Sequence, residues 1–123
     1  FIECSDKVFD EFFKTGDDVR TYKPHVEYLL ENNIRVMLYH GDADYICNWF
    51  GGIDVANQLV WENQVEFNAA PMQCWKVDDK DAGQIRSFGQ LWFVKIYESG
   101  HEVPFYQPKN SLDLFKRWIN NDS

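Results

Sequence analysis

The chain has 123 residues, of which 45% are hydrophobic, 26% charged and 17% aromatic, and this composition excludes collagen-like, coiled-coil and disordered classes, which lack the residues for a packed core. The 20 Asp and Glu residues outnumber the 12 Lys and Arg residues, so the formal net charge of −8 repels phosphate backbones and anionic membrane surfaces. We therefore expect one globular domain or part of one, with neither nucleic acid nor a membrane as its partner.

Two amphipathic helices are predicted before the first strand. Residues 6–13 place their apolar side chains on one helical face, with Ser5 as the expected N-cap and Gly16 as the expected end. Residues 22–32 form the second helix, with Pro24 in its first turn.

A strand and two further helices follow. The apolar run at residues 34–41 predicts a strand too deeply buried to alternate apolar and polar side chains. A helix is expected at residues 53–61, and a shorter one at residues 62–68 that Pro71 stops. A helix followed by a short turn and a buried strand is typical of α/β proteins.

The last part of the chain combines strands with one helix. Three segments are rich in aromatic and branched side chains, as strands are: residues 72–77, 84–88 and 91–97. The residues between them favour turns, so an antiparallel meander is predicted, with residues 78–83 as its first connection. Residues 109–119 form a final amphipathic helix.

Two of the predicted strands are followed directly by polar loops. Asp42 and Asp44 come after the strand at residues 34–41, and His101 comes after the strand at residues 91–97. Open α/β sheets place their sites beyond the carboxyl ends of strands. A carboxylate that fixes the tautomer of an imidazole is the downstream half of a Ser, Asp, His relay, in the chain order of α/β-hydrolases.

The sequence around these side chains resembles a known family. GDADYICNWFG, at residues 41–51, is similar to the segment around the catalytic Asp of serine carboxypeptidases, and GHEVP, at residues 100–104, to their catalytic-His segment. The similarity covers nearly the whole chain and is closest to secreted fungal members. The resemblance implies an α/β fold, in which residues 1–123 are the C-terminal part of an α/β-hydrolase catalytic domain. That part is a mixed sheet flanked by helices and is incomplete on its own.

The resemblance also implies an activity, the release of C-terminal residues from peptides by a serine-type carboxypeptidase through an acyl-enzyme. It makes Asp44 the catalytic carboxylate and His101 the general base, while Asp42 braces the loop. Neither a metal nor an organic cofactor is implied. The expected small-molecule partner is a peptide substrate.

Three further residues are expected at the substrate site. By resemblance, Asn48 ties down its turn through hydrogen bonds, and Cys47 is an unpaired cysteine close to the catalytic His. Glu102 stands where the family carries either Met or Glu. A carboxylate there would favour a basic substrate side chain, or it could face away from the substrate, and both alternatives stay open.

The other cysteines and histidines are expected to be structural. No pair of the three cysteines has the CxxC spacing of a zinc or redox site. Cys4 resembles a family cysteine whose disulfide partner lies in the N-terminal part, and Cys74 is expected to be a buried thiol in a strand. His25 and His40 have no catalytic context.

The nucleophile is missing from this stretch of sequence. No G-x-S-x-G occurs, and no serine lies at a glycine-flanked strand-to-helix turn. By resemblance the chain is roughly the last third of the enzyme, and its partner is the missing N-terminal portion or a second chain that bears the Ser. The alternatives are a truncated, non-catalytic binding domain, which the missing Ser favours, and another α/β-hydrolase such as an esterase.

The acidic composition and the resemblance both suit a secreted or vacuolar, lysosome-like protein. An N-glycosylation sequon occupies residues 121–123.

Overall fold

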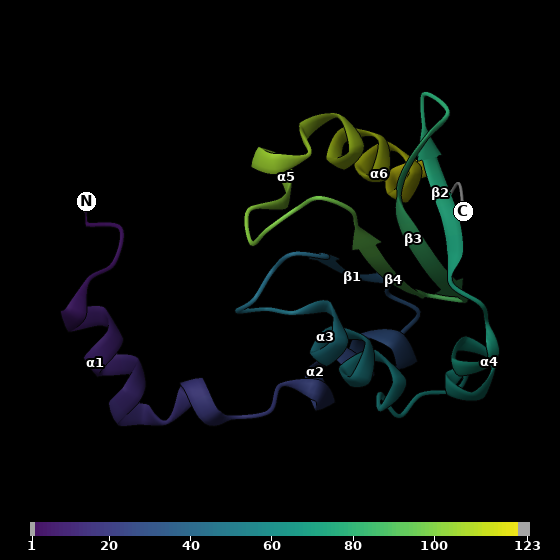
Figure 1. Cartoon of the computed structure of the whole chain (residues 1–123). Helices are drawn as coiled ribbons and strands as arrows, with labels where there is room; N and C mark the ends of the chain where they lie inside the picture. Colours follow the sequence, from purple (N-terminus) through teal and green to yellow (C-terminus); the bar gives the residue numbers. More distant parts are fainter. Residues whose placement is uncertain (1, 121–123) are drawn as a thin grey trace.

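The computed structural model describes residues 2–120, and the sequon at residues 121–123 lies outside them (Figure 1). The helices are α1 (Asp6–Thr15), the short 3-10 helix η1 (Asp17–Val19), α2 (Lys23–Glu31), α3 (Trp49–Asn57), α4 (Gln64–Ala69), α5 (Val103–Tyr106) and α6 (Pro108–Asn120). The strands are β1 (Val36–Gly41), β2 (Gln73–Val77), β3 (Lys80–Phe88) and β4 (Leu91–Ile96). Within residues 2–120, no helix has the length and apolarity needed to cross a membrane.

The four strands form one mixed sheet in the order β1-β4-β3-β2. Strands β2, β3 and β4 pair antiparallel, which confirms the predicted meander. Strand β1 pairs with β4 in parallel, with Val36 opposite Leu91 and Gly41 opposite Ile96. The carboxyl ends of β1 and β4 therefore lie at the same edge of the sheet, and the loops that follow them start side by side.

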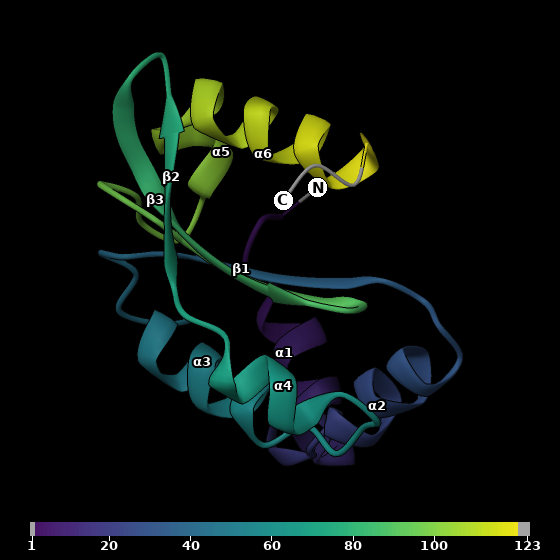
Figure 2. The same ribbon diagram turned by 90° about the vertical axis from the view of Figure 1, so that its right-hand side faces the viewer.

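Helices cover both faces of this sheet, with α5 and α6 over one face and α2, α3 and α4 over the other (Figure 2). Strand β4 is buried on both sides, because successive side chains of a strand point to opposite faces. Trp92, Val94 and Ile96 belong to the hydrophobic cluster that includes Leu114 of α6. Leu91 and Phe93 belong to the cluster on the other face, with α2, α3 and α4.

The predicted boundaries of α3 are wrong, while those of α1 and α2 are confirmed within a few residues. Helix α3 begins at Trp49 and not at Ile53, and it ends at Asn57. The cause is Asn48, whose side-chain oxygen accepts a hydrogen bond from the backbone N–H of Gly51 at 2.9 Å. An Asn at this position is an N-cap signal, which the sequence analysis treated only as a tie within the loop.

The connection between β2 and β3 is shorter than predicted. Strand β3 begins at Lys80, so the turn consists of Asp78 and Asp79 alone. Both have positive φ angles, 50° and 62°, the conformation that a two-residue hairpin turn requires. Asp tolerates this conformation better than most residues do, and this tolerance allows a tight hairpin without glycine.

Strand β1 is less buried than its apolar sequence predicts. It lies at the edge of the sheet, and its side chains are mostly half-buried, with Tyr39 46% exposed. Helix α1 extends away from the sheet (Figure 1) and contains no buried residue. Its apolar stripe of Phe9, Phe12 and Phe13 is exposed. The described residues thus leave apolar surfaces uncovered at both places.

Candidate active site

Asp44 and His101 meet beyond the carboxyl ends of the two parallel strands. The loop after β1 carries Asp44, and the loop after β4 carries His101. Their side chains are joined by a hydrogen bond of 3.0 Å between His101 Nδ1 and Asp44 Oδ2. The parallel register of β1 and β4 thus brings together two residues that are far apart in the sequence.

The Asp44 side chain is buried, with only 5% of its surface exposed, and three donors hold its carboxylate. Its Oδ1 accepts hydrogen bonds from the backbone N–H groups of Ile46 at 3.0 Å and Cys47 at 3.1 Å. Loss of solvation raises the pKa of Asp44, but the hydrogen bonds from His101, Cys47 and Ile46 outweigh this effect and lower the pKa below 3.8. Asp44 is therefore ionised at neutral pH and acts as a hydrogen-bond acceptor.

The ionised carboxylate of Asp44 determines which nitrogen of His101 carries the proton. An ionised carboxylate only accepts hydrogen bonds, so Nδ1 of His101 carries the proton and donates to Asp44. In the neutral imidazole this leaves Nε2 unprotonated, as a general base requires. The His101 side chain is 59% exposed, so Nε2 is open to a reacting group.

Asp42 braces the two loops, as predicted. Its Oδ1 accepts a hydrogen bond from the backbone N–H of Ser99 at 3.3 Å. The Ala43 N–H donates to the Ser99 carbonyl at 3.0 Å. Gly41 is needed at the end of β1, because a Cβ at that position would overlap the carbonyl oxygen of Ser99. These contacts fix the distance between the loop of Asp44 and the loop of His101.

The three residues expected at the substrate site have different surroundings. Cys47 is exposed, and its Sγ lies within 4.8 Å of ligand atoms of Asp44 and His101, as expected for a thiol beside the imidazole. Asn48 ties down the turn, as expected, by capping α3. Glu102 is exposed immediately before α5, and its carboxylate forms no ion pair with a described residue.

His40 supports the site in a way that the sequence analysis did not foresee. Its Nδ1 lies 2.9 Å from the carbonyl oxygen of Cys47, so Nδ1 carries the proton and donates it to that carbonyl. The ring stacks on Phe93 of β4 with a centroid distance of 5.7 Å. His40 is structural, as expected, and it fixes the backbone that carries the Cys47 thiol.

The backbone donors to Asp44 were also missed, although a signal exists. An Asp side chain commonly accepts from the N–H two residues later in an Asx turn. The segment from Asp44 to Cys47 has this arrangement. The two peptide groups that hold Asp44 were therefore predictable from the sequence, as were the two side chains of the candidate site.

The expectation for Cys74 is wrong, because its thiol is exposed. Cys74 lies on the edge strand β2, whose neighbouring residue Trp75 points into the core instead. The thiol donates to Asp81 Oδ1 at 3.2 Å, and this hydrogen bond, with desolvation and the negative charge of Asp81, raises the pKa of Cys74. Cys4 is likewise exposed and unbridged.

Residues 2–120 offer a general base for an acyl transfer, but no serine nucleophile in contact with that base. No serine hydroxyl within residues 2–120 is hydrogen-bonded to His101. The Ser99 hydroxyl, although close in sequence, is directed to the Gly100 carbonyl at 3.5 Å. In the same part of the chain, one cluster of three potential metal ligands occurs, formed by Asp44, Cys47 and His101.

Comparisons with known proteins cover almost the entire chain. A family model described as serine carboxypeptidase matches residues 1–121. Carboxypeptidase S1 homolog A of Arthroderma otae is 45% identical across 98% of this chain and 19% of its own length. Carboxypeptidase Y of Candida albicans is 37% identical across 97% of this chain and 22% of its own length. A vacuolar serine-type carboxypeptidase of Saccharomyces cerevisiae is 36% identical across 97% of this chain and 24% of its own length.

A solved carboxypeptidase structure also matches this chain. A prohormone-processing carboxypeptidase from Saccharomyces cerevisiae matches 80% of this chain and 22% of that chain, with a TM-score of 0.71 and 29% sequence identity. The chain therefore spans about a fifth of the length of these relatives, less than the third that the resemblance led us to expect.

Proposed function

The chain belongs to the serine carboxypeptidase family, and we propose that it supplies the Asp and the His of a serine-type carboxypeptidase, with the nucleophilic Ser outside it. The observation that carries this proposal is the hydrogen bond of 3.0 Å from His101 Nδ1 to Asp44 Oδ2. It leaves Nε2 of a well-exposed imidazole free to take a proton. Residues 1–123 are accordingly a C-terminal segment of the catalytic domain.

The reaction proceeds through an acyl-enzyme. His101 Nε2 removes the proton of the Ser hydroxyl as its oxygen attacks the carbonyl carbon of the terminal peptide bond, and then gives that proton to the leaving amine. Water hydrolyses the ester with His101 again as the base. Asp44 keeps the imidazole in the required tautomer and stabilises the imidazolium. No step needs a metal or an organic cofactor.

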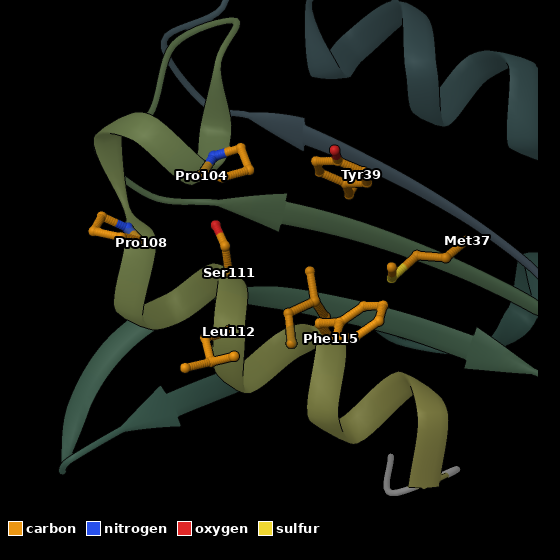
Figure 3. Close-up of a pocket in the computed structure, with 8 residues that line it drawn as sticks. Met37, Tyr39, Pro104, Pro108, Ser111, Leu112 and Phe115 are labelled. Carbon is orange, nitrogen blue, oxygen red and sulfur yellow. The ribbon is translucent and has the colours of Figure 1, made fainter.

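The rest of the enzyme is the proposed partner of the uncovered surfaces. An apolar groove of about 410 Å³ lies between the edge strand β1 and helix α6, and is lined by Met37, Tyr39, Leu112 and Phe115 (Figure 3). The hydroxyl of Ser111 also borders it, and its oxygen is buried without a hydrogen-bond partner in the described residues. Because the relatives are about five times longer, we assign this groove and the open edge of β1 to the remainder of the domain.

Glu102 is proposed to contact the substrate, since its carboxylate is exposed beside His101. A carboxylate there attracts a basic side chain near the scissile bond. Because the group is solvated, Glu102→Gln should lower kcat/KM for such peptides only about two- to fivefold, with less effect at high salt. The measurement compares Arg-containing and Leu-containing peptides at one pH. Equal losses for both would exclude substrate contact by Glu102.

The activity is tested by the requirement for a free terminal carboxylate. The complete protein should release the last residue of a blocked dipeptide, and amidation of that carboxylate should greatly slow release. Rapid hydrolysis of simple esters together with indifference to the carboxylate would favour an esterase instead.

A non-catalytic binding domain is kept as the second candidate function. Intact mass with and without reductant separates the two candidates if the enzyme is a processed, two-chain protein. A second chain released from Cys4 by reduction supports the enzyme. A free Cys4 in a protein that carries no further carboxypeptidase sequence supports the binding domain.

A secreted or vacuolar location is also proposed. It is supported by the net charge of −8 and by the similarity to a carboxypeptidase named as vacuolar.

A further inference from the structure

We propose that Gln107 is a positioning residue for the general base His101, because it fixes one peptide group in the loop that leads to the base. That peptide group joins Glu98 to Ser99. Its carbonyl oxygen, on Glu98, accepts a hydrogen bond from Gln107 Nε2 at 3.1 Å. Its N–H, on Ser99, donates to Asp42 Oδ1 at 3.3 Å. Two side chains thus hold one peptide group from both sides, and the effect of this contact on turnover rests on the proposed function.

The backbone of Glu98 needs such support. Its φ angle is 53°, in the left-handed region that residues other than Gly, Asn and Asp rarely adopt. A residue in this conformation costs free energy and stays there only when its surroundings fix it. Glu98 is exposed, so without Gln107 a water molecule can donate to the carbonyl oxygen. The peptide group is then free to rotate toward a less strained conformation.

A rotation of this peptide group would reach the base directly, since only one residue lies between Ser99 and His101. Ser99 is 1% exposed, and its carbonyl accepts a hydrogen bond from the Ala43 N–H at 3.0 Å. The peptide on the amino side of Ser99 therefore determines how the loop enters a fixed contact with the loop of Asp44. If that peptide rotates, the bond of 3.0 Å from His101 to Asp44 loses its alignment.

Gln107 is itself held in place by the helices on either side of it. It follows α5 and directly precedes α6 (Figure 1). Its Oε1 accepts a hydrogen bond from Asn110 Nδ2 at 3.1 Å, which leaves Nε2 to donate to Glu98. Its backbone N–H donates to the Val103 carbonyl at 2.8 Å, and its own carbonyl accepts from the Ser111 N–H at 2.9 Å. The helix pair therefore supplies a rigid donor to the loop of the base.

Gln107→Met tests the role by removing the donor while keeping a side chain of similar length. In the complete protein that contains this chain, kcat should fall at least about tenfold, because a misplaced base slows proton transfer. KM should change by less than about threefold, because substrate contacts are left in place. Steady-state kinetics measure both constants. A smaller loss of kcat, or a loss of kcat/KM that lies entirely in KM, would overturn the proposal.

Gln64→Met is the matched control. The Gln64 Nε2 also donates to a backbone carbonyl, that of Asn57 at 3.0 Å. Gln64 lies on α4, however, on the opposite face of the sheet from α5 and α6 (Figure 2). This variant should keep the kcat of the unmodified protein. An equal loss of kcat in Gln64→Met and Gln107→Met would show a general effect of such contacts and would overturn the positioning role.

A second substitution separates positioning from a general loss of stability. Asn adopts a positive φ angle more readily than Glu does. Glu98→Asn, added to Gln107→Met, should therefore raise kcat severalfold above that of Gln107→Met alone. A merely structural contribution of Gln107 would not be recovered in this way. No recovery, at equal folded fraction, would contradict the role of the Glu98 conformation.

Crystal structures of the complete protein and of Gln107→Met separate this inference from the proposed function, because they do not require turnover. In the variant we expect the peptide between Glu98 and Ser99 to be rotated, and His101 Nδ1 to lie more than about 3.5 Å from Asp44 Oδ2, beyond a hydrogen bond. This result in a protein without carboxypeptidase activity would support the positioning contact and contradict the enzyme. An unchanged peptide and an unchanged His101 contact would overturn the proposal, in an active or an inactive protein.

Discussion

The two carboxylate oxygens of Asp44 accept hydrogen bonds from different parts of the site. Oδ1 is held by the backbone of its own loop, through Ile46 and Cys47. Oδ2 holds the imidazole of His101. The loop geometry and the orientation of the proposed base therefore depend on one side chain, and a change of charge at this side chain should affect both.

Replacement of Asp44 by Asn tests its role as the partner of the base. Asp44→Asn keeps the size of the side chain, but the amide no longer favours the tautomer that accepts a proton at Nε2, so kcat should fall by about 10³–10⁴. Steady-state kinetics of the complete protein measure this effect. Asp42→Asn is the control, since its Oδ1 can still accept from Ser99. A larger loss of kcat in Asp42→Asn than in Asp44→Asn, at equal folded fraction, would show that the carboxylates are assigned in the wrong order.

The lowered pKa of Asp44 predicts an acid-dependent stability. A carboxyl group whose pKa is lower in the folded than in the unfolded state stabilises the fold above the unfolded pKa, about 3.9. This contribution is lost as pH falls through the folded pKa. The difference in the free energy of unfolding between the unmodified protein and Asp44→Asn should therefore be constant near neutral pH and decrease below pH 3.8. Denaturant unfolding at a series of pH values measures it, and a difference independent of pH would contradict the account.

The side chains of the site were predictable from sequence, whereas their surroundings were only partly so. Asp44 and His101 follow apolar strands within recognisable motifs, so a local pattern identifies them. The contact from His40 to Cys47 depends on how the loop folds back over β1, which no local pattern encodes. The exposure of Cys74 depends on which strand is the edge of the sheet, and an apolar strand sequence does not reveal its neighbours.

Among the elements, β1 and α3 position the candidate site most directly. Strand β1 places the loop of Asp44 beside β4, and α3 begins where that loop ends, at the Asn48 cap. For the longer elements, the pattern of apolar residues was enough to predict whether each is a helix or a strand. The start of α3 was misplaced because the Gly-rich sequence after Trp49 disfavours a helix, and the cap and tertiary packing outweigh that preference. Helix α5 was missed because it spans only Val103–Tyr106.

The Asn48 cap is expected to stabilise α3 and the loop in front of it. Asn48→Ala removes the acceptor for the Gly51 N–H and should lower the free energy of unfolding by about 1 kcal/mol. Asn48→Asp keeps an acceptor at the cap and should cost much less. Urea unfolding of the two variants checks this prediction. Equal destabilisation by Ala and Asp would show that packing of Asn48, and not capping, determines its contribution.

At the scale of the whole molecule, the described residues form one four-stranded sheet that leaves apolar surfaces uncovered. Its core lies between β4 and the helices on both faces, while β1 at the edge and the apolar stripe of α1 remain uncovered. Such surfaces normally contact other protein. The chain spans only about a fifth of the relatives' length, and under the proposed function the remaining segments would supply both the covering surface and the nucleophile.

The central claim is that His101 and Asp44 activate a serine outside this chain. Its most direct test is covalent labelling of the complete protein with a fluorophosphonate, followed by mapping of the labelled peptide by mass spectrometry. We predict one labelled serine outside these 123 residues, with the rate of labelling reduced at least about 10³-fold in His101→Ala. A label on a serine within this chain, no label at all, or an undiminished rate in His101→Ala would contradict the claim.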